Sequence, residues 1–436
     1  GSRALEIYTQ YHWEKDDLCW ESVSEPRSVG TEERNKGELG VEDNPVHPQV
    51  KDESSSEDNF DEGVRRKLGG LVITLQIEGV SSPLALTCIP SSVSGYRETA
   101  KWLGLTPTLS QSYADATRIK WMTDRLKECA QHNHGRIDEQ FIPRRLIDTR
   151  GSNLRLVERH DIQNSHTTYA ALSYCWGSAD DANLQLKTTT ASLEERKLKI
   201  GIESLTPVLK DAVFLANTLS IPYLWVDSLC ILQDDISDWE RQCVEVATLY
   251  NSALVTFCAA SSTSCLEGFL RQRGLRVRLQ FESARNPPVT GHFDLQVRYA
   301  FHEHMDSIDC RWKRRGWTFQ EARASTCQLI FGNSNIHLHC PDRSKTMGYN
   351  VPPSHRLVTP GEWTGFGLRE THALRYRTWS SVLQMYSLFD ARSFTKATDI
   401  LPALSGLAAQ YQGFLKDAYL AGLWRRDLHL GLLWRS

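Results

Sequence analysis

Six residues with functional potential stand at or just after the ends of two strand-length apolar runs in this 436-residue sequence: Tyr174, Trp176, Gly177, Asp227, Gln233 and Asp234. A carboxylate that follows a strand, such as Asp227, can bind a ribose hydroxyl or cap the next helix. The aromatic side chains of Tyr174 and Trp176 can stack on a nucleotide ring or fill the core. Gly177 fits either a tight turn or the close approach of a ligand.

A parallel sheet would bring these residues together. The apolar runs at 169–176, 223–227 and 253–260 have the length and composition of buried strands. Between them, apolar residues recur at helical spacing over 205–219 and 239–250. Strand–helix–strand order is typical of parallel βαβ units, whose strands end at one common edge, where open α/β sheets bind ligands. The sequence therefore predicts an α/β fold with a parallel βαβ core.

Composition divides the chain into four expected segments. Residues 1–64 form an acidic, largely flexible segment, since the stretch DESSSEDNFDEG has one aromatic and no aliphatic residue. Residues 65–164 form an α+β region that packs on the core, and residues 165–325 form the core itself. Residues 326–436 form a mostly helical extension.

Further elements are predicted outside the core from alternation and helical periodicity. We expect strands and hairpin strands at 68–80, 142–148, 153–158, 293–300, 327–332 and 335–340. We expect helices at 97–104, 111–131, 374–390 and 398–412. The tail at 421–435 carries five leucines and two tryptophans, so it should dock on the body of the protein.

The net charge, the length of the apolar runs and the number of cysteines exclude several classes of protein. A net charge of -3 gives no basic footprint for nucleic acid or anionic membrane. No apolar run approaches the ~20 residues that a membrane helix needs. The 11 cysteines are odd in number and scattered, which indicates reduced thiols and a cytoplasmic protein.

Two short runs of the sequence contain cysteine and histidine residues of the kind that bind metals. Cys129, His132 and His134 form one short run, and His337, His339 and Cys340 form another. Neither run contains a second pair at zinc-finger spacing, so each taken alone predicts no metal site. Neither a G-x-G-x-x-G fingerprint nor a P-loop appears, which argues against a dinucleotide dehydrogenase or a P-loop NTPase.

Several long motifs, in order, resemble the heterokaryon incompatibility (HET) family: YAALSYCWG (169–177), DAVFLANTLSI (211–221), YLWVDSLCILQDD (223–235), DWERQCVEVATLYNSALVTFCAAS (238–261) and RGWTFQE (315–321). The resemblance implies fungal self/non-self recognition and induction of cell death. HET domains are also distantly similar to TIR domains, several of which cleave NAD at the nicotinamide–ribose bond. On this basis NAD would be a substrate, and no cofactor would be needed.

The TIR resemblance also implies a catalytic glutamate soon after the third strand. Nicotinamide leaves as a neutral molecule, so one carboxylate that stabilises the cationic ribosyl centre is enough. Glu267 is the first candidate, although it follows Cys265 more closely than in TIR enzymes and can also be a surface loop residue. Glu240 is the second, although an acid in the first turn of a helix commonly complements the helix dipole. Gln320 and Glu321 either border the pocket or fasten the C-terminal region to the core.

Two other kinds of function remain open. A non-catalytic HET core can self-associate or bind a signalling partner protein. A stand-alone enzyme can use a pocket at Trp176 and Asp227 for small-molecule biosynthesis.

Overall fold

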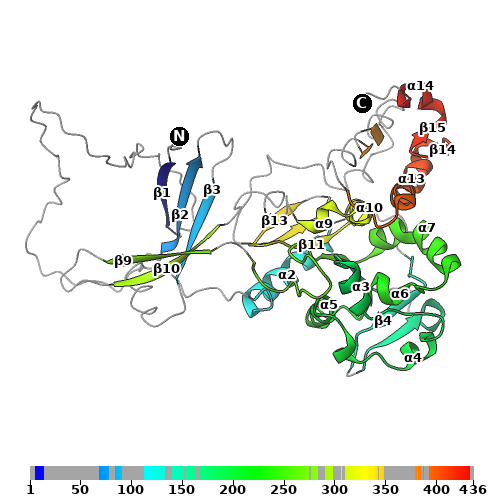
Figure 1. Cartoon of the computed structure of the whole chain (residues 1–436), viewed down its shortest axis with the longest axis horizontal. Helices are drawn as coiled ribbons and strands as arrows, with labels where there is room; N and C mark the ends of the chain where they lie inside the picture. The colour runs from blue at the N-terminus through cyan, green and yellow to red at the C-terminus, as the bar shows by residue number, and fades with distance from the viewer. Residues whose placement is uncertain are drawn as a thin grey trace, which may run out of the picture. The chain divides into compact units, whose positions relative to one another are not determined.

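The computed structural model describes residues 5–13, 68–77, 84–90, 112–132, 140–151, 153–162, 167–273, 276–282, 290–297, 306, 310–341, 343–347, 379–380, 382–383, 386 and 392–432 (Figure 1). The chain divides into two compact units. Residues 1–109 and 275–298 form the first, and residues 110–274 and 299–436 form the second.

An antiparallel sheet makes up the described part of the first unit (Figure 1). Its order is β1-β2-β3-β10-β9, with bounds Leu5–Trp13, Leu68–Ile77, Leu84–Pro90, Thr290–Val297 and Arg276–Glu282. Two expectations are corrected here. β1 lies within residues 1–64, which were expected to be largely flexible. β9 and β10 lie within residues 165–325, which were expected to form one continuous core, but these two strands belong to the first unit. Strand pairing is a long-range choice, and alternation within a strand does not reveal its partner.

The second unit contains a mixed sheet that includes eight of the described strands. Its order is β13-β12-β11-β8-β6-β7-β4-β5, with bounds Ser344–Thr346, Ile336–His339, Gln328–Phe331, Val255–Cys258, Tyr169–Ser173, Tyr223–Trp225, Arg145–Asp148 and Arg155–Glu158. β7, β6, β8 and β11 run parallel, and antiparallel strands flank them. The predicted parallel βαβ core is confirmed, within a mixed sheet. The extension expected from residue 326 begins with three strands of this sheet.

Burial explains the apolar runs. Every residue of β6, β7 and β8 is buried, so these strands show no polar alternation. Helix α5 (Pro207–Thr218) starts at a first-turn proline, and helix α7 (Ile236–Ser252) is capped by Asp235, whose side chain accepts hydrogen bonds from two backbone N–H groups. Both helices bury the predicted apolar faces.

The strand order creates a switch point beside β6. β7 and β8 lie on opposite sides of β6, so right-handed crossovers place α5 and α7 on opposite faces of the sheet. In such folds the loops after the central strand and its neighbour diverge and leave a crevice for a ligand. Here that crevice is expected between the loops that follow β6 and β8.

A buried ion pair stabilises the loop between β7 and α7 at this edge of the sheet. The Arg145 guanidinium on β4 contacts the Asp238 carboxylate in the first turn of α7, and both side chains are at most 1% exposed. Arg145 also donates to the Cys230 carbonyl over 2.8 Å, and Asp238 accepts from the Leu232 N–H over 2.9 Å. These bonds hold the loop between β7 and α7, because an unpaired buried charge would be costly.

The flanking elements follow the predictions in part. Helices α2 (Ala116–Cys129) and α13 (Pro402–Leu415) and the β4–β5 hairpin lie where the sequence predicts them. The tail docks through Trp424, which is 2% exposed and lies 5.4 Å from the Trp379 ring. The helix expected at 97–104 and most of the one at 374–390 lie outside the described residues. Among the helices that the structure describes, none is both long and apolar enough to cross a membrane.

Candidate functional site

The loops after β6 and β8 touch at the switch point. The Cys265 N–H donates to the Trp176 carbonyl over 3.3 Å. The guanidinium of Arg311 bridges the same two loops, donating to the Gly177 carbonyl at 3.2 Å and to the Thr263 carbonyl at 3.4 Å. The predicted residues of the first strand end therefore lie beside the loop that carries Glu267.

Gly177 makes this approach possible. Its φ of 99° lies in the left-handed region that side chains disfavour. A Cβ at this position would lie 2.7 Å from the Ser264 hydroxyl and 2.3 Å from an Asp181 carboxylate oxygen. The backbone turn and the close packing both require glycine, which fits either reading made from the sequence.

Glu267 is held through one of its two carboxylate oxygens. Oε2 accepts from the Thr263 N–H at 2.9 Å, the Thr263 hydroxyl at 3.2 Å and the Arg273 guanidinium at 2.7 Å. Oε1 accepts no hydrogen bond from the described residues, and the side chain is 35% exposed. Burial raises the pKa of Glu267, but the Thr263 hydrogen bonds and the Arg273 charge outweigh it and lower the pKa below its ordinary value. The carboxylate is therefore ionised at neutral pH, oriented, and open on one side.

Asp227 and Trp176 join the ends of β6 and β7. The Trp176 indole N–H donates to Asp227 Oδ2 over 2.9 Å, and the Ser228 N–H donates to Oδ1 over 2.7 Å. The Lys187 ammonium lies 5.5 Å from the centre of the Trp176 ring, on one of its faces. Burial raises the pKa of Asp227 despite the nearby charge of Arg315. Asp227 thus links the Trp176 side chain to the start of the helix that follows β7, and Lys187 occupies one face of the Trp176 ring.

Gln233 and Asp234 brace the next loop. The Gln233 amide donates to the carbonyls of Asp227 and Ile231, each at 3.0 Å. Asp234 accepts from the Thr190 N–H at 2.8 Å and from its hydroxyl at 2.7 Å, and these two bonds lower the pKa of Asp234. Both side chains are exposed at the predicted edge.

Glu321 belongs to a buried polar network below the edge. It lies on α10 (Gly316–Ala324) and accepts a short hydrogen bond from the Ser173 hydroxyl, which in turn accepts from the Trp312 indole over 2.8 Å. Burial raises the pKa of Glu321 to about 7, although the positive charge of Arg315 opposes this. The carboxyl group therefore keeps its proton to a higher pH than an exposed glutamate does.

Sequence reasoning missed Arg315, the cation of this network. Its guanidinium donates to the Tyr174 carbonyl, and its charge partly offsets the rise that burial causes in the pKa values of Asp227 and Glu321. The Tyr174 hydroxyl is buried close to Asp227 and Ser228 without an aligned hydrogen bond to either. The available signal was the arginine that opens RGWTFQE, the motif that also supplies Glu321.

Two predicted residues lie apart from this edge group. Gln320 is fully buried, and a Cβ on Gly406 of α13 would lie 2.2 Å from its amide nitrogen, so it packs between α10 and α13. Glu240 is exposed on α7, and no interaction among the described residues joins it to the carboxylates of the edge.

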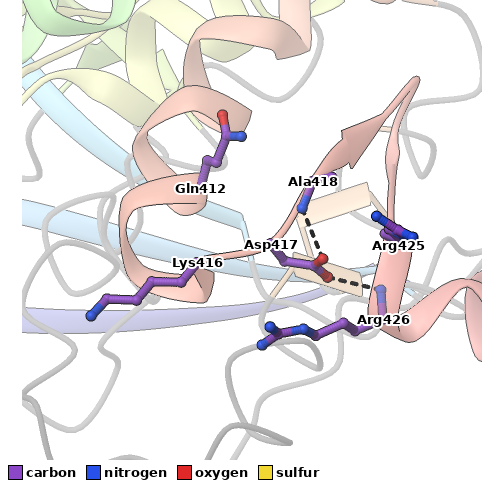
Figure 2. Close-up of a pocket in the computed structure, with 6 residues that line it drawn as sticks. All are labelled: Gln412, Lys416, Asp417, Ala418, Arg425 and Arg426. Atoms are coloured by element: carbon purple, nitrogen blue, oxygen red, sulfur yellow. Dashed lines mark hydrogen bonds between the residues drawn. The ribbon is translucent and has the colours of Figure 1, made fainter.

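A separate shallow depression lies at the C-terminal end of α13 (Figure 2). Its rim carries three basic side chains and one acid, and it is lined by Gln412, Lys416, Asp417, Ala418, Arg425 and Arg426. The Asp417 carboxylate accepts hydrogen bonds from the N–H groups of Ala418 at 2.8 Å and Arg426 at 2.9 Å. These bonds stabilise the local backbone conformation. None of the predicted site residues lines this depression.

Comparisons with known proteins place this edge within one family. Residues 169–321 match the family described as heterokaryon incompatibility protein (HET). No curated protein and no solved structure matches the chain. The matched range runs from the first residue of β6 to Glu321, and so includes the edge loops and the Arg315–Glu321 pair. Residues 169–321 are thus identified as a HET domain.

Proposed function

We propose that the HET core hydrolyses the nicotinamide–ribose bond of NAD or a related nucleotide at the edge of the sheet where the loops after β6 and β8 meet. The observation that carries this proposal is the way the Glu267 carboxylate is held. Its Oε2 is held by Thr263 and Arg273, while its Oε1 accepts no hydrogen bond from the described residues and lies at the switch point of the mixed sheet. Such an oriented carboxylate can stabilise positive charge as it develops on a bound sugar.

The chemistry requires little beyond this carboxylate. The bond between the pyridinium nitrogen and the ribose carbon breaks, and its electron pair leaves with nicotinamide as a neutral molecule. The cationic ribosyl centre is stabilised by Glu267, and a water molecule adds to it and loses a proton. The products are nicotinamide, ADP-ribose and one proton. The low pKa of Glu267 supports this role, because a protonated carboxyl would not stabilise a cation.

The neighbouring residues are proposed to position the nucleotide. Gly177 lets the loop after β8 pack against the loop after β6, and the exposed Arg311 beside it carries a positive charge suited to a phosphate. The half-buried ring of Trp176 is proposed to stack on a ring of the nucleotide. Glu321 and Asp227 lie in the buried network that supports the ends of β6 and β7. The biological role that we propose with this activity is fungal self/non-self recognition coupled to cell death.

The test is nicotinamide release from NAD by the full chain at high protein concentration, followed by chromatography. Glu267→Gln keeps the size and the hydrogen-bonding capacity of the side chain but removes its charge, and it should lower the turnover rate by roughly 10²–10³. Glu240→Gln is the matched control, because Glu240 is exposed on α7 and outside the edge group, and it should retain full activity.

The same experiment separates the rival functions. Loss of release in Glu267→Gln alone supports the glycohydrolase. No release in any sample, with concentration-dependent oligomers seen by light scattering, would favour the non-catalytic signalling module. Release that persists unchanged in folded Glu267→Gln would remove Glu267 from the mechanism.

A further inference from the structure

Two cysteine sulfurs and one histidine nitrogen, from two segments that are far apart in the sequence, lie close together beside the sheet of the second unit. The ligand atoms of Cys129, His132 and Cys340 all lie within 4.8 Å of one another. The Cys340 sulfur lies 3.7 Å from Nδ1 of His132. The sequence predicted no metal site, because the runs that contain Cys129 and Cys340 were each incomplete when judged alone.

We propose that Cys129, His132 and Cys340 bind a zinc ion. With Zn–S bonds of ~2.3 Å and Zn–N bonds of ~2.05 Å, tetrahedral angles separate a sulfur and a nitrogen ligand by roughly 3.6 Å and two sulfur ligands by roughly 3.8 Å. The separation of 3.7 Å between Cys340 and His132 matches the first of these distances. The remaining separations need a contraction of at most about 1.2 Å, which side-chain rotation can supply.

The backbone presents the three ligands from two rigid turns. Cys129 ends α2, and the His132 N–H donates to the Cys129 carbonyl over 3.0 Å, which fixes the C-x2-H spacing in one turn. Cys340 follows β12, and its backbone exchanges hydrogen bonds of 2.9 and 3.2 Å with Arg343 across the hairpin to β13. Because both turns are already formed, binding the ion would cost little ordering of the chain.

Burial and ligand type favour zinc over other biological cations. Cys129 is 4% exposed and Cys340 is 2% exposed, whereas His132 is partly exposed. Two thiolates and an imidazole form a soft ligand set that suits zinc and not calcium or magnesium. On binding, each thiol gives up its proton, so two protons are released and the site has no net charge. Water can take the fourth position from the solvent side.

The ion would fasten the C-terminal end of α2 to the β12–β13 hairpin at one edge of the sheet. The full chain, purified without an affinity tag or chelator and under reducing conditions, should contain about one zinc ion per chain. After removal of zinc, cobalt should restore a tetrahedral ligand-field spectrum with thiolate-to-metal charge transfer. Chelation should lower the Tm by several degrees, and zinc should restore it.

Cys340→Ser and His132→Gln should each lose the bound zinc and the effect of the chelator on Tm. Cys243→Ser is the matched control, because Cys243 is a half-buried thiol on α7 outside the cluster, and it should keep both. If a variant fails to fold, the cobalt spectrum of the wild-type chain decides the question. Reduced wild-type protein that binds neither zinc nor cobalt would overturn the proposal. So would a Cys129–Cys340 disulfide found by mass spectrometry in protein that takes up no metal once reduced, or zinc retained in folded Cys340→Ser.

Discussion

The indole N–H of Trp176 donates to the carboxylate of Asp227 over 2.9 Å and so joins the end of β6 to the end of β7. Asp227 lies in the first turn of the short helix α6 (Asp227–Cys230), so the bond ties the first edge loop to the second. The sequence left each residue with either a ligand contact or a structural role, and the structure shows that their side chains bind each other. Two of the loops at the proposed nucleotide site are therefore already joined to each other.

Replacing Trp176 by Phe should destabilise the protein, because Asp227 loses a donor while burial already disfavours its charge. We expect the free energy of unfolding in urea to fall by about 1–3 kcal/mol. Trp239→Phe removes the same volume from a half-buried tryptophan that packs edge-on against Trp317. This control should cost less than Trp176→Phe, and equal losses would contradict the importance of the indole–carboxylate bond.

Glu321 should make stability depend on pH. Its pKa in the folded chain is about 7, above its ordinary value of 4.5. As the pH rises between these values, the unfolded chain loses a proton that the folded chain keeps. The contribution of Glu321 to the free energy of unfolding should therefore fall across this window, by about 3 kcal/mol in total, and then level off.

Glu321→Gln isolates this contribution, because glutamine keeps the side chain's size and can still accept a hydrogen bond from Ser173. Urea denaturation at a series of pH values should show that the wild-type curve falls more steeply than that of the variant between pH 4.5 and about 7. Parallel curves would mean that the Glu321 carboxyl titrates as it does in water.

A buried carboxylate also explains why residue 332 is glycine. Asp306 is 1% exposed and accepts hydrogen bonds from the Ser334 N–H at 2.9 Å and the Asn335 N–H at 3.0 Å, and it lies 3.0 Å from the ring of His337. A Cβ on Gly332 would lie 2.0 Å from an oxygen of this carboxylate. Gly332→Ala should therefore displace Asp306 and lower the free energy of unfolding by roughly 2–4 kcal/mol.

Gly413→Ala is the control for this change. Gly413 lies in helix α13, and a Cβ there would meet nothing within 4 Å. Alanine should stabilise the helix by about 0.5–1 kcal/mol. Similar Tm values for the two variants would contradict the steric account.

Much of the core could be predicted, because its signals are local. β6, β7 and β8 are buried on both faces and appear as apolar runs, and the buried face of α5 appears at helical spacing. Parallel order then places the ends of the strands at one edge. This reasoning was enough to bring Trp176, Gly177 and Asp227 close to one another.

The remaining features depend on contacts that distant segments make. β10 pairs with β3, and nothing within either strand indicates its partner. Arg315 was overlooked because its significance lies in the burial of Glu321 and Asp227 around its charge. Cys129 and Cys340 lie far apart in the chain, so ligand spacing could not connect them. Gln320 was expected either at the pocket or against the C-terminal region, and the structure places it against α13.

We propose that Glu267 is the carboxylate of a nucleotide hydrolase. The rate of nicotinamide release from saturating NAD should be measured for the wild-type chain and for Glu267→Gln, together with NAD binding by both. Both proteins should bind NAD, and the variant should turn it over roughly 10²–10³ times more slowly. Equal rates in the two folded proteins, or NAD binding by neither, would contradict the proposal.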